Sequence, residues 1–335
     1  MPEIRYLVIA LVIIFLIISE ISLAWWGHDI FTFLVVTSIP GFDYNKYAEL
    51  REYNYVEKRN YKSGKYSTEE LLLNKKGELR VPDELSSSVH LKTISGISIP
   101  VWMILTEYVT FPDNGMDMVP GAMPIELFIG ETQANRHGYV KIQAFEFFEG
   151  NKSFVHFMDL SRQAFLRKDF YWGYRFFAYS LHYLEDLMQP YHVRPGTVPE
   201  MIVAVFDKNT RKMLTNAHEL YDMYLEYLML FSKNKHDLLR VIRETKPIIM
   251  NVPDDRLIYE AIVYSYSNFF KVHNEIKKIF GSRLYESVSM KDFVDKENSR
   301  ELDNLYEITC GIVQTMAGVI KGLILKIENT MGGID

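Results

Sequence analysis

The chain has 335 residues, of which 48% are hydrophobic, 14% aromatic and 24% charged. This composition excludes a disordered protein, and a formal net charge of −6 argues against a broad nucleic-acid-binding surface. A single long apolar run excludes a multipass membrane protein. The one cysteine, Cys310, excludes both an internal disulfide and a cysteine-based zinc site.

The N-terminus has the pattern of an export signal. Arg5 precedes an unbroken apolar run from Tyr6 to Ile18, and a small-x-Ala sequence ends at Ala24. A membrane-spanning helix needs about 20 apolar residues, so we predict that residues 1–24 are a signal peptide removed after Ala24. The processed protein would be secreted or extracytoplasmic. Without cleavage, the same segment would anchor the protein to a membrane.

The predicted elements that follow are mostly helical. Residues 44–61 are expected to form a polar surface helix, 64–88 an exposed loop, and 95–135 a loop with short elements. Apolar residues three and four apart then predict five long helices, at residues 152–166, 170–187, 213–232, 254–279 and 302–329. In the last helix, Lys321 and Lys326 interrupt the apolar run, which favours a packed helix over a membrane-bound one.

These elements predict an all-α fold. They also predict one domain over residues 25–335, with a long insertion around residues 40–100.

Two histidine–aspartate pairs have a spacing that suits metal binding. His182 precedes Asp186 by four residues, and His218 precedes Asp222 by four. On a helix such residues share one face, where an imidazole and a carboxylate can bind the same metal ion. The first pair is followed by a Gln-Pro sequence, and the proline should end the helix so that His192 can turn back toward the same site. A buried His–Asp hydrogen bond without metal is the alternative.

The motif His-Tyr-Leu-x-Asp-x-x-Gln-Pro-x-His, from His182 to His192, resembles the signature of the zinc-dependent phospholipase C and single-strand-specific zinc nuclease superfamily. Four short motifs between His28 and Asp222 carry this resemblance. Members of the superfamily are exported all-α enzymes whose site holds three zinc ions, so the resemblance implies three zinc ions as cofactors here. Glu185 departs from the pattern, because relatives usually have glycine at that position, and it would add charge near the site.

The resemblance implies that one zinc is bound close to the processed N-terminus. Trp25, the first residue after cleavage, would bind through its amino group and carbonyl oxygen, and His28 would belong to the same cluster. Trp26 takes the place of Trp25 if cleavage occurs one residue later. Export and activity would then be coupled, because the uncleaved chain lacks a ligand.

The resemblance implies two further zinc ions along the chain. The second would be bound by Asp113, His137, His182 and Asp186. The third would be bound by His192, His218 and Asp222. Asp186 would bridge two ions, and Asp113 is the candidate catalytic carboxylate. Asp117 remains an alternative to Asp113, because this stretch is longer than in the relatives.

The resemblance and the residues leave three functions open. The first is a phospholipase C that hydrolyses phospholipid head groups with a zinc-bound hydroxide. It is favoured because Val193-Arg194-Pro195-Gly196 follows the motif, where the nuclease branch has a Gly- and Asp-rich loop. The second is a single-strand-specific nuclease, and the third a non-enzymatic exported helical protein. The expected partner is a phospholipid or a single-stranded nucleic acid as substrate. Peripheral membrane contact also remains open, and no protein partner is inferred.

Overall fold

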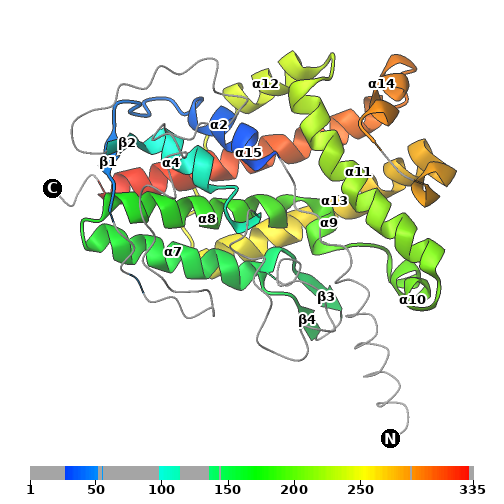
Figure 1. The fold of residues 1–335 in the computed structure, drawn as a ribbon, viewed down its shortest axis with the longest axis horizontal. Helices are drawn as coiled ribbons and strands as arrows, with labels where there is room; N and C mark the ends of the chain where they lie inside the picture. Colours follow the sequence, from blue (N-terminus) through cyan, green and yellow to red (C-terminus); the bar gives the residue numbers. More distant parts are fainter. Residues whose placement is uncertain are drawn as a thin grey trace, which may run out of the picture.

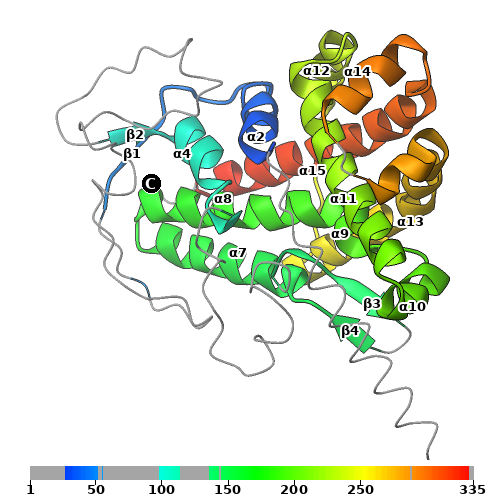
Figure 2. The same ribbon diagram turned by 45° about the vertical axis from the view of Figure 1, so that its right-hand side comes forward.

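The computed structural model describes residues 27–51, 55, 98–113, 136–142, 145–286 and 289–331. Within these residues the chain is mostly helical, which confirms the predicted all-α class (Figures 1 and 2). The predicted signal peptide, Trp25, Asp117 and most of the 40–100 insertion lie outside the described residues.

The helices are named by their order along the chain. They are α2 (His28–Val36), α4 (Val101–Tyr108), α7 (Gly150–Leu166), α8 (Phe170–Met188), α9 (Pro190–Val193), α10 (Val198–Phe206), α11 (Lys208–Leu230), α12 (Lys235–Glu244), α13 (Asp254–Phe280), α14 (Lys291–Asn298) and α15 (Asp303–Met331), with a 3-10 helix η2 at Gly281–Tyr285. All five predicted long helices are present. Only α11 begins well before its expected start, because the polar sequence 208–212 lacks apolar periodicity. Asp207 caps it by accepting from the backbone N–H groups of Asn209 and Thr210.

α8 lies at the centre of the bundle. It contacts α7, α4, α13 and α15, and every residue from Tyr171 to Met188 is buried. Its sequence is apolar or aromatic around most of the helix circumference, which is the pattern of a helix surrounded by others. In both views α7 and α8 lie side by side, with α15 along another side of α8 (Figures 1 and 2). Any polar side chain on α8 therefore points into the interior.

Two short antiparallel pairs of strands complete the described part of the chain. β1 (Tyr47–Glu49) pairs with β2 (Ser98–Pro100), and β3 (Val140–Ile142) pairs with β4 (Phe145–Phe147). The helix predicted over residues 44–61 is therefore wrong where the structure describes it. The β1–β2 pairing joins segments far apart in the sequence and buries Ala48 opposite Ile99, an interaction that local periodicity does not reveal.

One described helix, Asp303–Thr330 within α15, is long and apolar enough to cross a membrane, and 67% of its most apolar window is buried inside the protein. Lys321 is buried and donates from Nζ to three backbone carbonyl oxygens at the end of α12, at 2.7 to 3.1 Å. A Cβ atom at Gly322 would overlap the carbonyl oxygen of Ile248, so the chain crosses the helix in direct contact there. These contacts are those of a helix packed within the protein.

Candidate metal centre

Eight of the nine predicted ligands lie in the described residues, and all eight come together near the C-terminal end of α8. Trp25, the ninth, lies outside the described residues. Three groups have ligand atoms that all lie within 4.8 Å of one another: His28, Asp113 and His182; His137, His182 and Asp186; and His192, His218 and Asp222. Seven of the eight are buried, and the eighth, Asp113, is half-buried. These buried histidine and aspartate groups can hold metal ions.

Asp186 occupies the middle of the cluster. Its Oδ1 atom lies 3.3 Å from His28 Nε2 and 3.5 Å from His192 Nδ1. Its Oδ2 atom lies 2.8 Å from His137 Nδ1 and 3.2 Å from His182 Nε2. Burial opposes its ionisation, but His192, His182 and His137 hold the pKa of Asp186 well below its ordinary value. A charged carboxylate with histidines facing each of its oxygens would be able to hold a cation on either side.

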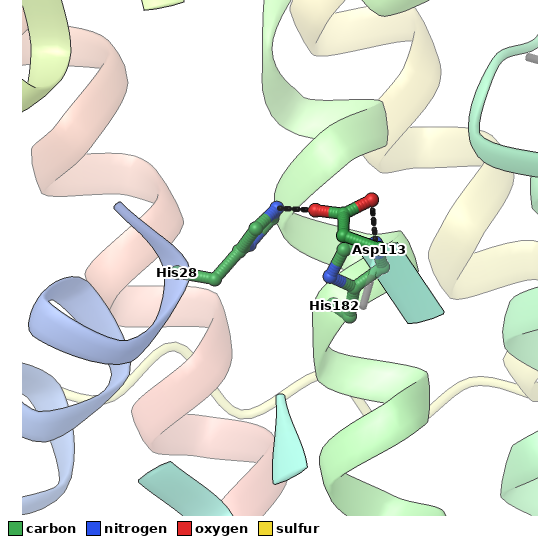
Figure 3. Close-up of side chains that lie close together, drawn as sticks. All are labelled: His28, Asp113 and His182. Atoms are coloured by element: carbon green, nitrogen blue, oxygen red, sulfur yellow. Dashed lines mark ion pairs between the residues drawn. The ribbon is translucent and has the colours of Figure 1, made fainter. Parts of the chain in front are cut away.

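Asp113 lies shortly beyond the end of α4 and faces the same histidines as Asp186. Its carboxylate oxygens lie 3.9 Å from His28 Nε2 and 3.5 Å from His182 Nε2 (dashed lines in Figure 3). Two ligand atoms on one tetrahedral zinc ion lie roughly 3.3–3.6 Å apart, given zinc–ligand bonds of about 2.0–2.2 Å. His137 Nδ1 lies 3.3 Å from the same carboxylate. The distances of Asp113 to His137 and His182 fall within this spacing, and the distance to His28 is longer. The choice of Asp113 over Asp117 stays a prediction.

The third group has buried polar atoms without partners. His192 Nε2, both ring nitrogens of His218, and Asp222 Oδ2 make no hydrogen bond. His218 Nε2 and Asp222 Oδ2 lie 3.3 Å apart, which again suits two ligands of one cation. Leaving a buried polar atom unpaired costs about 1–3 kcal/mol. A cation bound here would satisfy these atoms together, so the residues present fit a metal ion.

Burial also sets the protonation of these groups. It lowers the pKa values of His182, His192 and His218, which keeps their imidazoles in the neutral form that binds metals. Burial raises the pKa of Asp222 well above its ordinary value, so its carboxylate is disfavoured when no cation is near. A divalent cation reverses that preference by pairing with the charged form.

Glu185 orients the ring of His28. His28 Nδ1 lies 2.6 Å from Glu185 Oε2, and Thr32 donates from its hydroxyl to Glu185 Oε1 at 2.7 Å. With Nδ1 bound in this way, Nε2 of His28 points toward Asp186. A carboxylate behind a metal-binding histidine fixes the tautomer and raises the basicity of the ring. The sequence showed only an acidic residue near the site, because the contact joins positions 157 residues apart.

Gln189, from the Gln-Pro sequence, links two parts of the third group. Its Nε2 donates to Asp222, and its Oε1 accepts from the backbone N–H groups of Tyr191 and His192. α8 ends at Met188, immediately before it, and α9 starts at the proline that follows. The motif therefore ends one helix, begins the next and holds the Asp222 carboxylate in place.

A glycine brings His137 to the cluster. The backbone N–H of Gly150 donates to the carbonyl oxygen of Gly138 at 2.9 Å, and Ser153 donates from Oγ to the carbonyl oxygen of Arg136 at 3.0 Å. A Cβ atom at position 150 would lie 2.8 Å from Gly138 O and 2.9 Å from His137 O. Only glycine lets the start of α7 approach this backbone so closely.

Neither the scan against models of protein families nor the search of curated proteins found a match for the chain. The geometry of the cluster is therefore the basis on which a function can be inferred.

Proposed function

We propose that the protein is an exported zinc-dependent phosphodiesterase of the phospholipase C type, with three zinc ions in the cluster around Asp186. The observation that carries the proposal is the convergence of three ligand groups on one buried carboxylate, with unpaired nitrogen and oxygen atoms in the third group. The donors are only imidazole nitrogens and carboxylate oxygens, a set that zinc accepts. Zinc ions roughly 4 Å apart lower the pKa of a shared water molecule and bind phosphate oxygens.

Asp113 has the position of a catalytic carboxylate. Its side chain is 13% exposed, more than any of the other seven ligands in the cluster. It is therefore the one of these ligands that solvent reaches most readily. In our proposal its carboxylate accepts a proton from the attacking water, while Asp186 stays buried between the histidines.

The position of His28 supports a role for the processed N-terminus. His28 is the first residue of α2, and only two residues separate it from Trp25. Three extended residues span at most about 11 Å, so an amino terminus at Trp25 would lie within reach of the cluster. Removal of residues 1–24 would then complete the site, and an uncleaved chain would bind less zinc.

The aromatic rings against the cluster favour a phospholipid over a nucleic acid. Tyr183 packs beside His137 and His182, and Tyr191 stacks on His218 with ring centroids 5.7 Å apart. Both tyrosines are almost completely buried, so neither offers a face on which a base could stack. Binding of single strands depends on such exposed rings. Within the described part of the chain, the rings that contact the cluster fill the core instead.

Two measurements on the signal-processed protein test the proposal. Zinc is counted by mass spectrometry, and hydrolysis of phosphatidylcholine vesicles is followed beside cleavage of a single-stranded oligonucleotide. His182→Ala should abolish diacylglycerol release. His236→Ala, an exposed histidine on α12 outside the cluster, should leave it unchanged.

The outcomes separate the three functions. Three zinc ions and diacylglycerol release that depends on His182 support the phospholipase. Oligonucleotide cleavage without lipid turnover would assign the protein to the nucleases. A protein that binds no zinc would be unable to activate water for hydrolysis, and this result would support the non-enzymatic alternative.

A further inference from the structure

α10 presents an apolar face to solvent. Its exposed apolar residues are Val198, Pro199, Ile202, Val203 and Phe206. Phe206 is 84% exposed and Ile202 is 49% exposed. They share one side of the helix, while Met201 and Ala204 on the opposite side are buried. Single exposed apolar residues are common on protein surfaces, but several that lie together on one face indicate an interaction site.

The helix is firmly held, so this exposure does not come from a loose end. Thr197 and Glu200 form a capping box at its start. Glu200 also accepts from His273 Nε2 at 2.9 Å and from Lys277 Nζ, both on α13. The polar contacts of α10 therefore all lie on its inner side, and the outer side carries no charge.

Basic residues follow the apolar face directly along the chain. Lys208 and Lys212, at the start of α11, are exposed, and Arg211 between them is half-buried. Asp207, the acidic residue between α10 and α11, accepts from the backbone N–H groups at the start of α11 and caps that helix. An apolar helix face with a basic edge is the pattern of a helix that lies in a membrane interface, where lysines meet anionic head groups.

We propose that α10 and the first turn of α11 form a lipid-docking surface, with the apolar face of α10 inserted at the boundary between head groups and acyl chains. This inference rests on the proposed phospholipase function. It adds the surface by which the enzyme meets its substrate in a bilayer.

The docking surface is joined directly to the metal centre. Five residues connect His192 to the start of α10, and Arg194 within this link packs on the rings of Tyr266 and Phe270, with its guanidinium 4.8 and 4.5 Å from their centroids. His218 lies ten residues along α11 from Lys208, a distance of about 15 Å at 1.5 Å per residue. Figures 1 and 2 show α10 at the edge of the molecule, beside the start of α11. Docking there would bring the cluster close to the bilayer surface.

Sedimentation with sucrose-loaded vesicles tests this surface. The vesicles contain phosphatidylcholine alone or phosphatidylcholine mixed with phosphatidylglycerol. Ile202→Ser combined with Phe206→Ser should lower partitioning into both at least about tenfold, because two apolar side chains no longer enter the lipid. Lys208→Gln combined with Lys212→Gln should lower partitioning several-fold for the anionic vesicles only.

The matched control is Phe231→Ser, which changes another exposed phenylalanine at the far end of α11 and should leave partitioning unchanged. The proposal is overturned if the unaltered protein does not sediment with either vesicle. It is also overturned if partitioning into the vesicles falls as much in Phe231→Ser as in the double serine variant. It is also overturned if light scattering shows a dimer that the double serine variant converts to a monomer, because a second copy would then cover α10.

A separate assay keeps this proposal apart from the proposed activity. Partitioning is measured both with zinc and after chelation, so it requires no turnover. Hydrolysis of monomeric short-chain phosphatidylcholine is measured without vesicles. Vesicle binding without hydrolysis of the monomeric lipid would mean that the phospholipase function fails. Hydrolysis without vesicle binding would mean that the docking surface fails.

Discussion

Replacing Glu185 tests whether the carboxylate that contacts His28 Nδ1 tunes the proposed metal centre. Glu185 is fully buried and accepts hydrogen bonds from both His28 and Thr32. Glu185→Ala removes both, so the His28 ring loses its orientation and part of its basicity. Glu185→Gln has nearly the same shape and keeps one oxygen that can accept from His28, but it removes the negative charge.

The position of Glu185 behind His28 indicates how much zinc affinity the substitutions should cost. Loss of a carboxylate behind a metal-binding histidine typically weakens metal affinity 10- to 100-fold, which is about 1.4–2.7 kcal/mol. We expect zinc affinity to fall close to 100-fold in Glu185→Ala and close to 10-fold in Glu185→Gln. Burial raises the pKa of Glu185, so its charge is disfavoured in the folded protein without metal. Glu185→Gln should therefore unfold at a higher temperature than the unaltered protein when both are zinc-free.

The assay is a competitive zinc titration, paired with thermal unfolding of the zinc-free proteins. Glu297→Gln is the matched control, because Glu297 is also a buried carboxylate that accepts from hydroxyl groups, on α14 away from the cluster. The control should lose stability and keep its zinc affinity. Unchanged zinc affinity in Glu185→Ala would refute the reasoning and leave Glu185 as a packing residue.

Three other changes have expected outcomes. Gln189→Ala should lower zinc occupancy by one ion per chain, counted by mass spectrometry, because Asp222 and the start of α9 lose their shared partner. Burial opposes the ionisation of Glu200, but hydrogen bonds from His273, Lys277 and Thr197 hold its pKa below the ordinary 4.5. Ionised Glu200 therefore adds to the free energy of unfolding above pH 4.5, and this stabilisation is lost as the pH falls below that value. Urea titrations at several pH values should show that Glu200→Gln removes about 1–2 kcal/mol of this pH-dependent stability. Lys321→Met should lower the free energy of unfolding by about 1–3 kcal/mol, because three carbonyl oxygens at the end of α12, one of them buried, lose their donor; an unchanged urea midpoint would contradict the capping role.

The long helices were predictable because each buries one face or its whole circumference. Repeats of three and four residues located α7, α8, α13 and α15 to within a few positions. The spacing in the His182–His192 motif and in the His218–Asp222 pair was equally informative. There, helix geometry alone brings the side chains to one side, and the proline turns the chain back.

What the sequence could not show depends on contacts between distant segments. The β1–β2 pair has three residues in each strand, too few for an alternating pattern to be visible. The role of Glu185 depends on His28 and Thr32 of α2 reaching it across the bundle, and that of Gly150 on the backbone of Gly138 passing against α7. In each case the residue type was visible in the sequence, but its partner was not.

The distribution of the proposed metal ligands along the chain has a consequence for the order in which the site would form. His192, His218 and Asp222 lie within 30 positions of one another, so this group can assemble once α9 and α11 have packed. The group of His28, Asp113 and His182 extends over 154 positions and requires α2 and the end of α4 to be in place beside α8. Since closing a longer loop costs more entropy, the first group is expected to capture its ion earlier in folding. The metal ion beside the N-terminus would then bind last, and only after the rest of the fold has formed.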